Sequence, residues 1–183
     1  MIISICVSTW NYQKRPTLRS AEVSTPWGTA LVVMQEEAIV EWWFASWEES
    51  KEALVRRWPK AHWVEDDAEV KETVRAIFDS DRSIDLKLCL KGTEFQVSVW
   101  KALMSINSGE VTTYQAVAKA IGRPTAVRAV ANAIGQNPIS WLIPCHRIIH
   151  SDGRLGGYRW GVDIKTRLLH DEAFLSNLPL NFS

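Results

Sequence analysis

The spacing of apolar residues changes near residue 90, and this change limits the folds open to the chain. Residues 84–90 alternate strictly between apolar and polar side chains, which is typical of a half-buried strand. Residues 94–106 instead place their apolar side chains on one stripe, as in an amphipathic helix. A chain of 183 residues has room for two small domains. We therefore expect an α/β domain over residues 1–88 and a helical domain over residues 89–183.

The first half alternates between strand-like and helix-like segments. Its apolar beginning lacks the basic segment and the cleavage site of a signal peptide, so we expect a strand there. Runs of Val, Ile and Trp predict strands over residues 22–34, with a break at 26–28, and over residues 38–44. Apolar residues at helical spacing predict helices over residues 47–57 and 66–78.

Two short helices separated by a glycine are expected in the second half. Thr112 is the expected N-cap of the first helix, and Gln115 would complete a capping box. Gly122 suits the end of that helix, and Thr125 is the expected N-cap of the next one, which runs to Gly135. This order is that of a helix-turn-helix, although a plain pair of packed helices has the same spacing.

The net charge of zero conceals a difference between the two halves. Residues 1–88 carry 11 Lys and Arg against 15 Asp and Glu, a net charge of −4. Residues 89–183 carry 10 against 6, a net charge of +4, and residues 112–170 carry 8 against 2. Such asymmetry favours a polyanion such as nucleic acid as the partner of the basic half, with an ordinary solvated surface as the alternative.

The cysteines and histidines exclude several classes of protein. The 3 cysteines cannot all pair and are widely spaced, which indicates a reducing compartment rather than a disulfide framework. Neither they nor the 4 histidines have the spacing of a structural zinc site. No apolar run approaches the roughly 20 residues that span a bilayer. Cys6 and Cys89 lie in strand patterns, where we expect small buried core residues.

Cys145 has a different setting, because it stands between Pro144 and His146 and is followed by Arg147. A free thiol has a pKa of about 8.5, and nearby cations lower it. An imidazole and a guanidinium beside the thiol therefore favour ionisation to the nucleophilic thiolate. Strand-like apolar runs, residues 141–143 and 148–149, are expected on either side.

Several short motifs around this cysteine occur in the order of one known family. They are IPCHRII at 143–149, GGYRWG at 156–161, LLxxE at 168–172, GTxFQxxVW at 92–100, TYxxVA at 113–118, AVRAV at 126–130 and NP at 137–138. Together they resemble the O6-methylguanine-DNA alkyltransferase family, in particular its bacterial adaptive-response type. A related non-enzymatic branch carries tryptophan in place of the cysteine, so Cys145 argues against that branch.

The resemblance implies an α/β + α protein, with a small ribonuclease-H-like domain followed by a winged helix-turn-helix catalytic domain. It implies DNA repair by direct reversal, in which the alkyl group on O6 of guanine moves irreversibly to Cys145 in a single turnover. No cofactor and no metal are implied. His146 would activate the thiol through a water molecule, and Glu172 would orient His146. Asn137 would hold the active-site turn, and Tyr114 would donate a proton toward N3 of the leaving guanine.

The resemblance also implies how DNA is held. Arg128 would fill the gap left by a flipped base. Further contacts to the DNA backbone are expected from Thr125, Ala126, Ala129 and Tyr114. The substrate pocket is expected to comprise Ile148, Gly156, Gly157, Tyr158, Arg159 and Trp160.

The expected partner is double-stranded DNA containing O6-alkylguanine. We expect a monomer without a membrane anchor, in the cytoplasm, or in the nucleus of a eukaryote. Trp160, where some family members carry glycine, is expected to restrict bulky alkyl groups. The rival hypotheses are a DNA-binding module without chemistry and a Cys-His hydrolase, although no oxyanion loop is recognisable for the latter.

Overall fold

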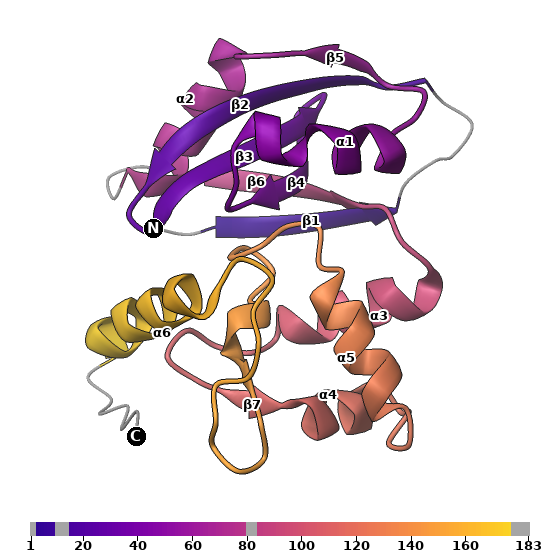
Figure 1. Cartoon of the computed structure of the whole chain (residues 1–183), viewed down its shortest axis with the longest axis vertical. Coiled ribbons are helices and arrows are strands. Elements are labelled where there is room, and N and C mark those ends of the chain that lie inside the picture. The colour runs from indigo at the N-terminus through magenta and orange to yellow at the C-terminus, as the bar shows by residue number, and fades with distance from the viewer. Residues whose placement is uncertain (1–2, 10–14, 80–83, 177–183) are drawn as a thin grey trace. The chain divides into compact units, whose positions relative to one another are not determined.

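The computed structural model describes residues 3–9, 15–79 and 84–176, with side chains from residue 15 to residue 173 apart from the gap. The chain divides into two compact units, Met1–Lys91 and Gly92–Ser183. Together they form a mixed α/β protein, with strands mainly in the first unit and helices mainly in the second (Figure 1).

The first unit is built on one six-stranded sheet with the order β1-β6-β4-β3-β2-β5. The central strands β2, β3 and β4 are antiparallel neighbours, whereas β1 and β4 flank β6 in parallel and β5 lies parallel to β2. The strands are β1 (Ile3–Thr9), β2 (Thr17–Thr25), β3 (Gly28–Gln35), β4 (Ala38–Trp43), β5 (His62–Val64) and β6 (Ile84–Leu90).

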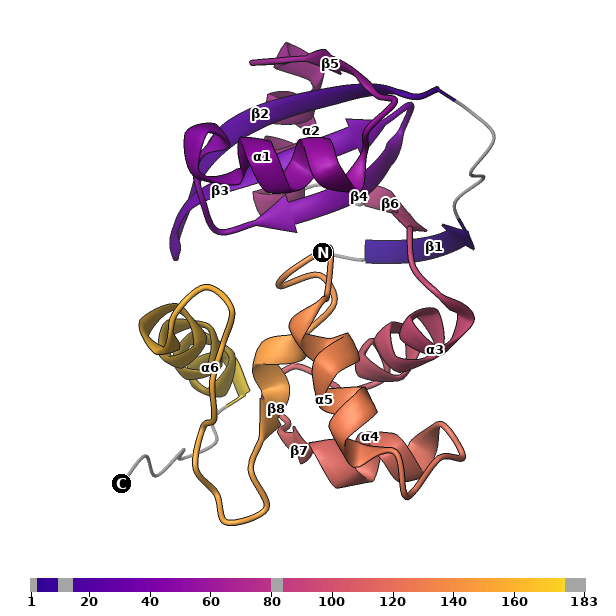
Figure 2. The same ribbon diagram turned by 45° about the vertical axis from the view of Figure 1, so that its right-hand side comes forward.

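Two helices accompany this sheet, α1 (Trp47–Arg57) and α2 (Ala68–Phe78), where the sequence predicts them. Ser46 begins α1 with a capping box that includes Glu49, and Asp67 caps the first turn of α2. Figures 1 and 2 show α1 on the face of the sheet turned toward the viewer and α2 behind it.

The strand predictions are largely confirmed, with two differences. The expected strand over residues 22–34 is a hairpin whose first arm begins earlier, at Thr17, because the polar residues that open β2 obscure the alternation. Its turn is stabilised by the Thr25 hydroxyl, which donates to the carbonyl of Gly28 over 2.6 Å. The three-residue β5 was not predicted, since so short a strand has no periodicity to detect.

A buried carboxylate organises the end of β4. Glu41, 1% exposed, accepts hydrogen bonds from Arg57 Nε (2.5 Å), Trp58 Nε1 (2.8 Å) and Trp43 Nε1 (3.0 Å). Because a buried charge is tolerated only when it is paired and hydrogen-bonded, these donors make the carboxylate compatible with the core. The tryptophan-rich stretch thus has a structural role that its sequence does not reveal.

The second unit is mainly helical. Its long elements are α3 (Glu94–Leu103), α4 (Tyr114–Ala120), α5 (Val127–Gly135) and α6 (Val162–Ser176) (Figure 2). A small parallel sheet pairs β7 (Thr112–Thr113) with β8 (Ile148–Ile149), and a 3₁₀ turn η1 (Cys145–Arg147) precedes β8. The predicted pair of helices separated by Gly122 is therefore present, and Gly122 adopts the left-handed φ of +70° expected after a helix end.

Four local predictions in this unit are wrong. Thr112 and Gln115 form no capping box, because the chain stays extended through Thr113, whose hydroxyl accepts from the Ala116 amide and caps α4. Thr125 does not cap α5, whose N-cap is Ala126 without a side-chain hydrogen bond.

The third wrong prediction concerns residues 141–143, which form a turn rather than the expected strand. Trp141 has a φ of +68°, which a strand cannot contain. α3 also ends at Leu103, three residues before the predicted end.

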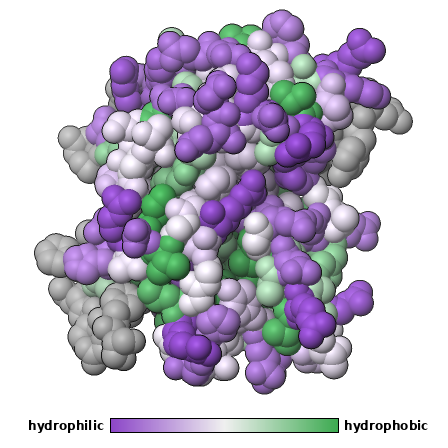
Figure 3. Space-filling view, in the orientation of Figure 1, coloured by the Kyte–Doolittle hydropathy of each residue, from purple (hydrophilic) through white to green (hydrophobic). Residues whose placement is uncertain are grey.

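On the face seen in Figure 3, hydrophilic side chains cover much of the surface and apolar residues appear in small separate areas. The exposed large apolar residues among the described side chains are Val55, Phe78, Val111 and Val162. Of the helices in the described residues, none combines the length and apolar character needed to cross a membrane.

The Glu41 cluster gives a first prediction. Glu41→Ala leaves the partly buried Arg57 guanidinium and two indole N–H groups without their acceptor, so the free energy of unfolding should fall by about 3–5 kcal/mol. Urea denaturation measures this loss. The control is Glu37→Ala, which removes a solvent-exposed partner of Lys87 and should leave stability nearly unchanged. Equal effects of the two substitutions would contradict a structural role for the cluster.

Candidate active site

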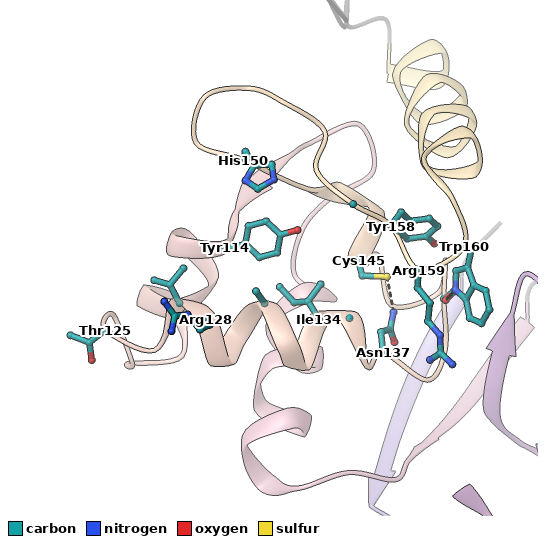
Figure 4. A pocket seen from close by; sticks show the side chains of 15 residues that line it. Tyr114, Thr125, Arg128, Ile134, Asn137, Cys145, His150, Tyr158, Arg159 and Trp160 are labelled. Atoms are coloured by element: carbon teal, nitrogen blue, oxygen red, sulfur yellow. Dashed lines mark hydrogen bonds between the residues drawn. The ribbon is translucent and has the colours of Figure 1, made fainter. Parts of the chain in front are cut away.

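Cys145 begins the 3₁₀ turn η1, not a strand as the apolar runs on either side suggest. The thiol is 8% exposed and lies at the inner end of a cleft (Figure 4). The tight turn at residues 139–145 is maintained by the Ile143 amide, which donates to the carbonyl of Ile139 over 3.0 Å. The nucleophile candidate therefore sits on a sharply folded and largely buried segment.

Asn137 anchors this segment with its side chain, which is 2% exposed. Its amide nitrogen Nδ2 donates to the carbonyl of Ile143 over 2.8 Å and to Sγ of Cys145 over 3.0 Å. Its Oδ1 accepts from the Ile139 amide over 3.1 Å. One buried amide thus holds both the backbone of the turn and the sulfur.

His146 faces a carboxylate on α6. Its Nε2 lies 2.8 Å from Oε1 of Glu172, and the imidazole is fully buried. Arg147 donates two hydrogen bonds to the same carboxylate, from Nε over 2.9 Å and from Nη2 over 2.8 Å. Nδ1 of His146 has no hydrogen-bond partner among the described residues.

The electrostatics of these groups follow from burial and pairing. Burial would by itself raise the pKa of the Glu172 carboxyl, but hydrogen bonds and charge from His146 and Arg147 together lower it to about 2. Burial lowers the pKa of His146 despite the opposing effect of Glu172. The Glu172 carboxylate accepts only, so Nε2 of a neutral His146 carries the proton and Nδ1 is free to accept one.

Burial raises the pKa of the Cys145 thiol, and hydrogen bonds from Asn137 and Tyr158 and the charge of Lys165 oppose that rise. Neither His146 nor Arg147 is among the groups whose charge lowers the pKa of the thiol. The Arg147 guanidinium is bound to Glu172, and burial favours a neutral His146.

Lys165 is a site residue that the sequence reasoning missed. It is 1% exposed, and its ammonium donates to the carbonyls of Ile148, over 2.6 Å, and Leu155. Burial lowers its pKa to about 8. The helical spacing from Lys165 to Leu168, Leu169 and Glu172 puts all four on one buried face of α6, and this spacing could have revealed it.

The cleft that leads to the thiol has a volume of about 1130 Å³. It is bounded by the N-terminal part of α4, one side of α5 and the loop after β8 (Figure 4). Its lining includes nine of the predicted site residues: Tyr114, Thr125, Arg128, Asn137, Cys145, Gly157, Tyr158, Arg159 and Trp160.

The other predicted residues lie outside this lining. His146 and Glu172 are buried behind the thiol, and Ile148 is buried with its carbonyl accepting from Lys165. Gly156 adopts a φ of +69° beside His150. Ala126 and Ala129 are on the same helical segment as Arg128 but do not face the cleft.

Six lining residues were missed, and nothing in the local sequence distinguishes the two polar ones, Ser140 and His150, from surface residues; the other four are Val127, Ala131, Ile134 and Gly135 on α5. Ser140 is 1% exposed, and its hydroxyl accepts from Nε1 of Trp160 over 2.5 Å. His150 packs against Tyr114 with the ring centres 5.7 Å apart. Among the side chains described, those of residues 15–79 and 84–173, no three His, Cys, Asp or Glu converge in a way that could hold a metal ion.

The Glu172 carboxyl gives a pH-dependent prediction. Its pKa falls from 4.5 to about 2 on folding, so its ionised form stabilises the folded state above pH 4.5, and this contribution is lost as the pH falls toward 2. The difference in free energy of unfolding between the wild type and Glu172→Gln should therefore shrink over that range, as measured by urea denaturation. Glu110→Gln, which changes an exposed loop residue, is the control with which the Glu172 difference is compared.

The sequence model of the 6-O-methylguanine DNA methyltransferase DNA-binding domain matches residues 94–174. The regulatory protein Ada of Salmonella typhimurium is 51% identical over 104 residues, which are 57% of this chain. The chain matches 30% of the length of that protein.

A methylated-DNA–protein-cysteine methyltransferase of Methanosarcina barkeri is 50% identical over 113 residues, which cover 60% of this chain and 72% of that protein. Among solved structures, Mycobacterium tuberculosis OGT in complex with DNA has a TM-score of 0.68 and 32% identity, over 88% of this chain and 95% of that one. The likeness therefore extends through both units. On these grounds the chain belongs to the methylated-DNA–protein-cysteine methyltransferase family.

Proposed function

We propose that the protein repairs DNA by direct reversal, moving the alkyl group from O6 of guanine to Sγ of Cys145. The observation that carries the proposal is the buried thiol at the inner end of an open cleft, hydrogen-bonded to Asn137 and adjoining the His146–Glu172 pair. Methylated-DNA–protein-cysteine methyltransferase is the name of several relatives. The protein would thus be a methyltransferase that acts on itself.

His146 is the proposed base. Its Nδ1 is buried and available, and burial favours the neutral imidazole, so the ring can accept the thiol proton through one water molecule. Glu172 keeps the proton on Nε2 and stabilises the imidazolium that forms, while Arg147 holds the carboxylate in place. The thiolate then attacks the alkyl carbon, the S–C bond forms and the C–O6 bond breaks.

The leaving guanine needs a proton or a hydrogen bond to neutralise its developing negative charge. Tyr114 lines the cleft, and burial raises the pKa of its hydroxyl, so it remains protonated and can donate toward N3. The backbone amide of Arg159 would contact O6. The Ile148 carbonyl, which already accepts from Lys165, has a second lone pair for the exocyclic amine.

We assign DNA binding to a winged helix-turn-helix formed by α4, α5 and the β7–β8 region. A relative has been solved in complex with DNA. Because a base inside a duplex cannot reach a buried thiol, the target must flip out. Arg128 is exposed at the start of α5, where it can occupy the vacated position, and Thr125, Ala126 and Ala129 can approach the backbone of the minor groove.

The first unit, expected over residues 1–88, is proposed as a ribonuclease-H-like support for the catalytic unit. Its sheet of mixed strands with two helices is compatible with that description. The protein would work as a monomer on double-stranded DNA containing O6-alkylguanine, in the cytoplasm or in the nucleus of a eukaryote.

The pocket for the alkyl group is proposed to be small. Gly157 leaves space for the flipped base, whereas the Trp160 indole lines the cleft and is held by Ser140. A methyl group needs little room, but a benzyl group would have to displace the indole, which typically costs about 1–3 kcal/mol.

No cofactor is required for a thiolate to displace an alkyl group at carbon. The thioether is not readily reversed, and the sequence has no second cysteine near Cys145 that could resolve it. Each molecule would therefore act once.

The proposed function predicts stoichiometric methylation of one residue. Incubation with duplex DNA containing O6-methylguanine should add one methyl group per protein, and peptide mapping should place it on Cys145. Cys145→Ser should abolish the transfer, whereas Cys89→Ser, which changes a buried thiol of the first unit, should retain it. A methyl group on Cys6 or Cys89, or repeated turnover, would contradict the mechanism. Binding to the DNA without any transfer would identify a DNA-binding module instead.

Base flipping predicts a selective role for Arg128. Unstacking a base costs a few kcal/mol in a duplex and nothing for a free base, so Arg128→Ala should slow repair of duplex DNA by roughly tenfold to a hundredfold. Reaction with free O6-methylguanine should change by less than about twofold, since no flipping energy enters that rate. Arg123→Ala removes the same charge outside the cleft lining and is the matched control. Equal losses on both substrates would assign Arg128 a merely structural role.

A further inference from the structure

His150 lines the cleft but has no part in the proposed mechanism. Its position follows from the small parallel sheet, in which Thr113 of β7 pairs with Ile149 of β8. The next residue after Thr113 is Tyr114, and the next after Ile149 is His150. Because neighbouring strands run about 4.8 Å apart, residues at matching positions of a parallel pair lie close together. The register of the sheet thus brings the imidazole to the phenol.

A tight turn fixes the backbone of His150. Its amide donates to the carbonyl of Arg154 over 2.9 Å, and its carbonyl accepts from the Gly153 amide over 3.1 Å. Gly153 has a φ of +84°, the left-handed conformation that commonly closes such a turn. Oδ1 of Asp152 accepts from the Arg154 amide over 3.1 Å and stabilises the same turn. The His150 side chain therefore starts from a defined point on the lining of the cleft.

The imidazole of His150 contacts two other parts of the site. Its ring centre lies 5.7 Å from that of Tyr114, and the two ring planes are inclined by 52°. The imidazole also lies against Gly156, where an added Cβ would come within 2.9 Å of its Cδ2 and Nε2 atoms and 3.6 Å of the Tyr114 hydroxyl oxygen. Any side chain at position 156 would therefore push the imidazole aside. The imidazole, the phenol hydroxyl and the Gly156 backbone thus meet at one place in the site.

The direction of the Tyr114 hydroxyl matters for the leaving group. The residue begins α4 and lines the cleft, with its hydroxyl directed toward the side that holds Cys145 (Figure 4). Two rotatable bonds set that direction, so it is defined only when packing holds the ring in one rotamer. A hydrogen bond weakens steeply when the donor turns away from the acceptor. A neighbour that fixes the ring therefore affects donation without touching the substrate.

We infer that His150 is a positioning residue for Tyr114, whose phenol ring it holds in the direction from which the hydroxyl donates to the leaving guanine. The inference rests on the proposed function insofar as Tyr114 is that donor. The ring-centre distance lies within the range of about 4.5–7 Å in which aromatic pairs attract each other in preferred orientations, so the contact resists rotation of the phenol. His150 gains and loses no atom in this role.

The contact itself is tested by NMR, without DNA and without activity. The ring current of Tyr114 should displace the signals of the His150 ring protons in protein labelled with ¹³C-histidine. The chain has 4 histidines, and His150→Ala assigns the signal. At one fixed pH, Tyr114→Leu should move the His150 signal and leave those of the other histidines in place. An unmoved His150 signal would overturn the inference.

Kinetics test the positioning role. His150→Ala should slow methyl transfer at saturating duplex DNA by roughly threefold to tenfold, the effect expected for the loss of one aromatic contact. Transfer from free O6-methylguanine should slow by the same factor, because the leaving group is the same. His150→Phe keeps a ring against Tyr114 and should restore the rate to within about twofold of the wild type. His150→Ala should cause no further loss when Tyr114 is already Phe.

A second reaction of the same thiol separates positioning from general damage to the site. Iodoacetamide alkylates Cys145 with loss of iodide, which leaves without a proton, so this rate should stay within about twofold in each His150 variant. Peptide mass spectrometry distinguishes Cys145 from the other cysteines. His170→Ala removes an exposed histidine of α6 and is the matched control, which should transfer methyl groups at the rate of the wild type.

The inference is overturned if His150→Ala slows only the reaction with duplex DNA, because the imidazole would then be a DNA contact. It is also overturned if His150→Phe is as slow as His150→Ala, or if the loss persists when Tyr114 is already Phe. A parallel loss with iodoacetamide would make His150 merely structural. A wild type that transfers no methyl group would refute the proposed function. Normal transfer by both the wild type and His150→Ala would refute the positioning role alone.

Discussion

The hydrogen bonds of the Asn137 amide are the constraint on which the rest of the site depends. A single buried side chain joins the backbone amide of Ile139, the carbonyl of Ile143 and the sulfur of Cys145. Because no solvent reaches the amide, water could not replace these bonds if the side chain were lost. The thiol lines the cleft only while the turn keeps this shape. Asn137 follows the end of α5 at Gly135 by two residues, so the packing of α5 helps to position the amide.

The charges of the candidate site are arranged so that the ion pair of Arg147 and Glu172 lies beside two groups, Cys145 and His146, that burial favours as neutral. Arg147 and Glu172 remain ionised, and their mutual pairing keeps both charges satisfied. Burial meanwhile disfavours the charged forms of both Cys145 and His146. Donors aimed at the sulfur offset this cost only for the thiolate, as expected for a preorganised site. The thiolate form is thus favoured by the Asn137 amide and by the charge of the buried Lys165, and not by the Arg147 guanidinium, which is bound to Glu172.

Much of this arrangement could be predicted from the sequence, and the exceptions have physical reasons. The amphipathic segments 47–57 and 66–78 form helices as predicted, because their periodicity and caps agree. Cys145 could be selected from its Pro-Cys-His-Arg setting, whereas Glu172 could be selected only through the family resemblance. The strand expected at 141–143 is absent because side-chain bonds from Asn137 impose a turn that apolar composition does not reveal. Ser140 and Lys165 escaped notice since their importance lies in contacts across the fold.

The two main side-chain contacts of the site, Asn137 with Cys145 and His146 with Glu172, differ in sequence separation. This difference affects the order in which they can form during folding. Asn137 and Cys145 are separated by 8 residues, whereas His146 and Glu172 are separated by 26. Contacts between residues close in sequence cost less loop entropy and form faster. During synthesis, the turn that holds the sulfur can therefore close before α6 has left the ribosome. The turn that holds the thiol forms first, and the imidazole receives its carboxylate only when α6 docks.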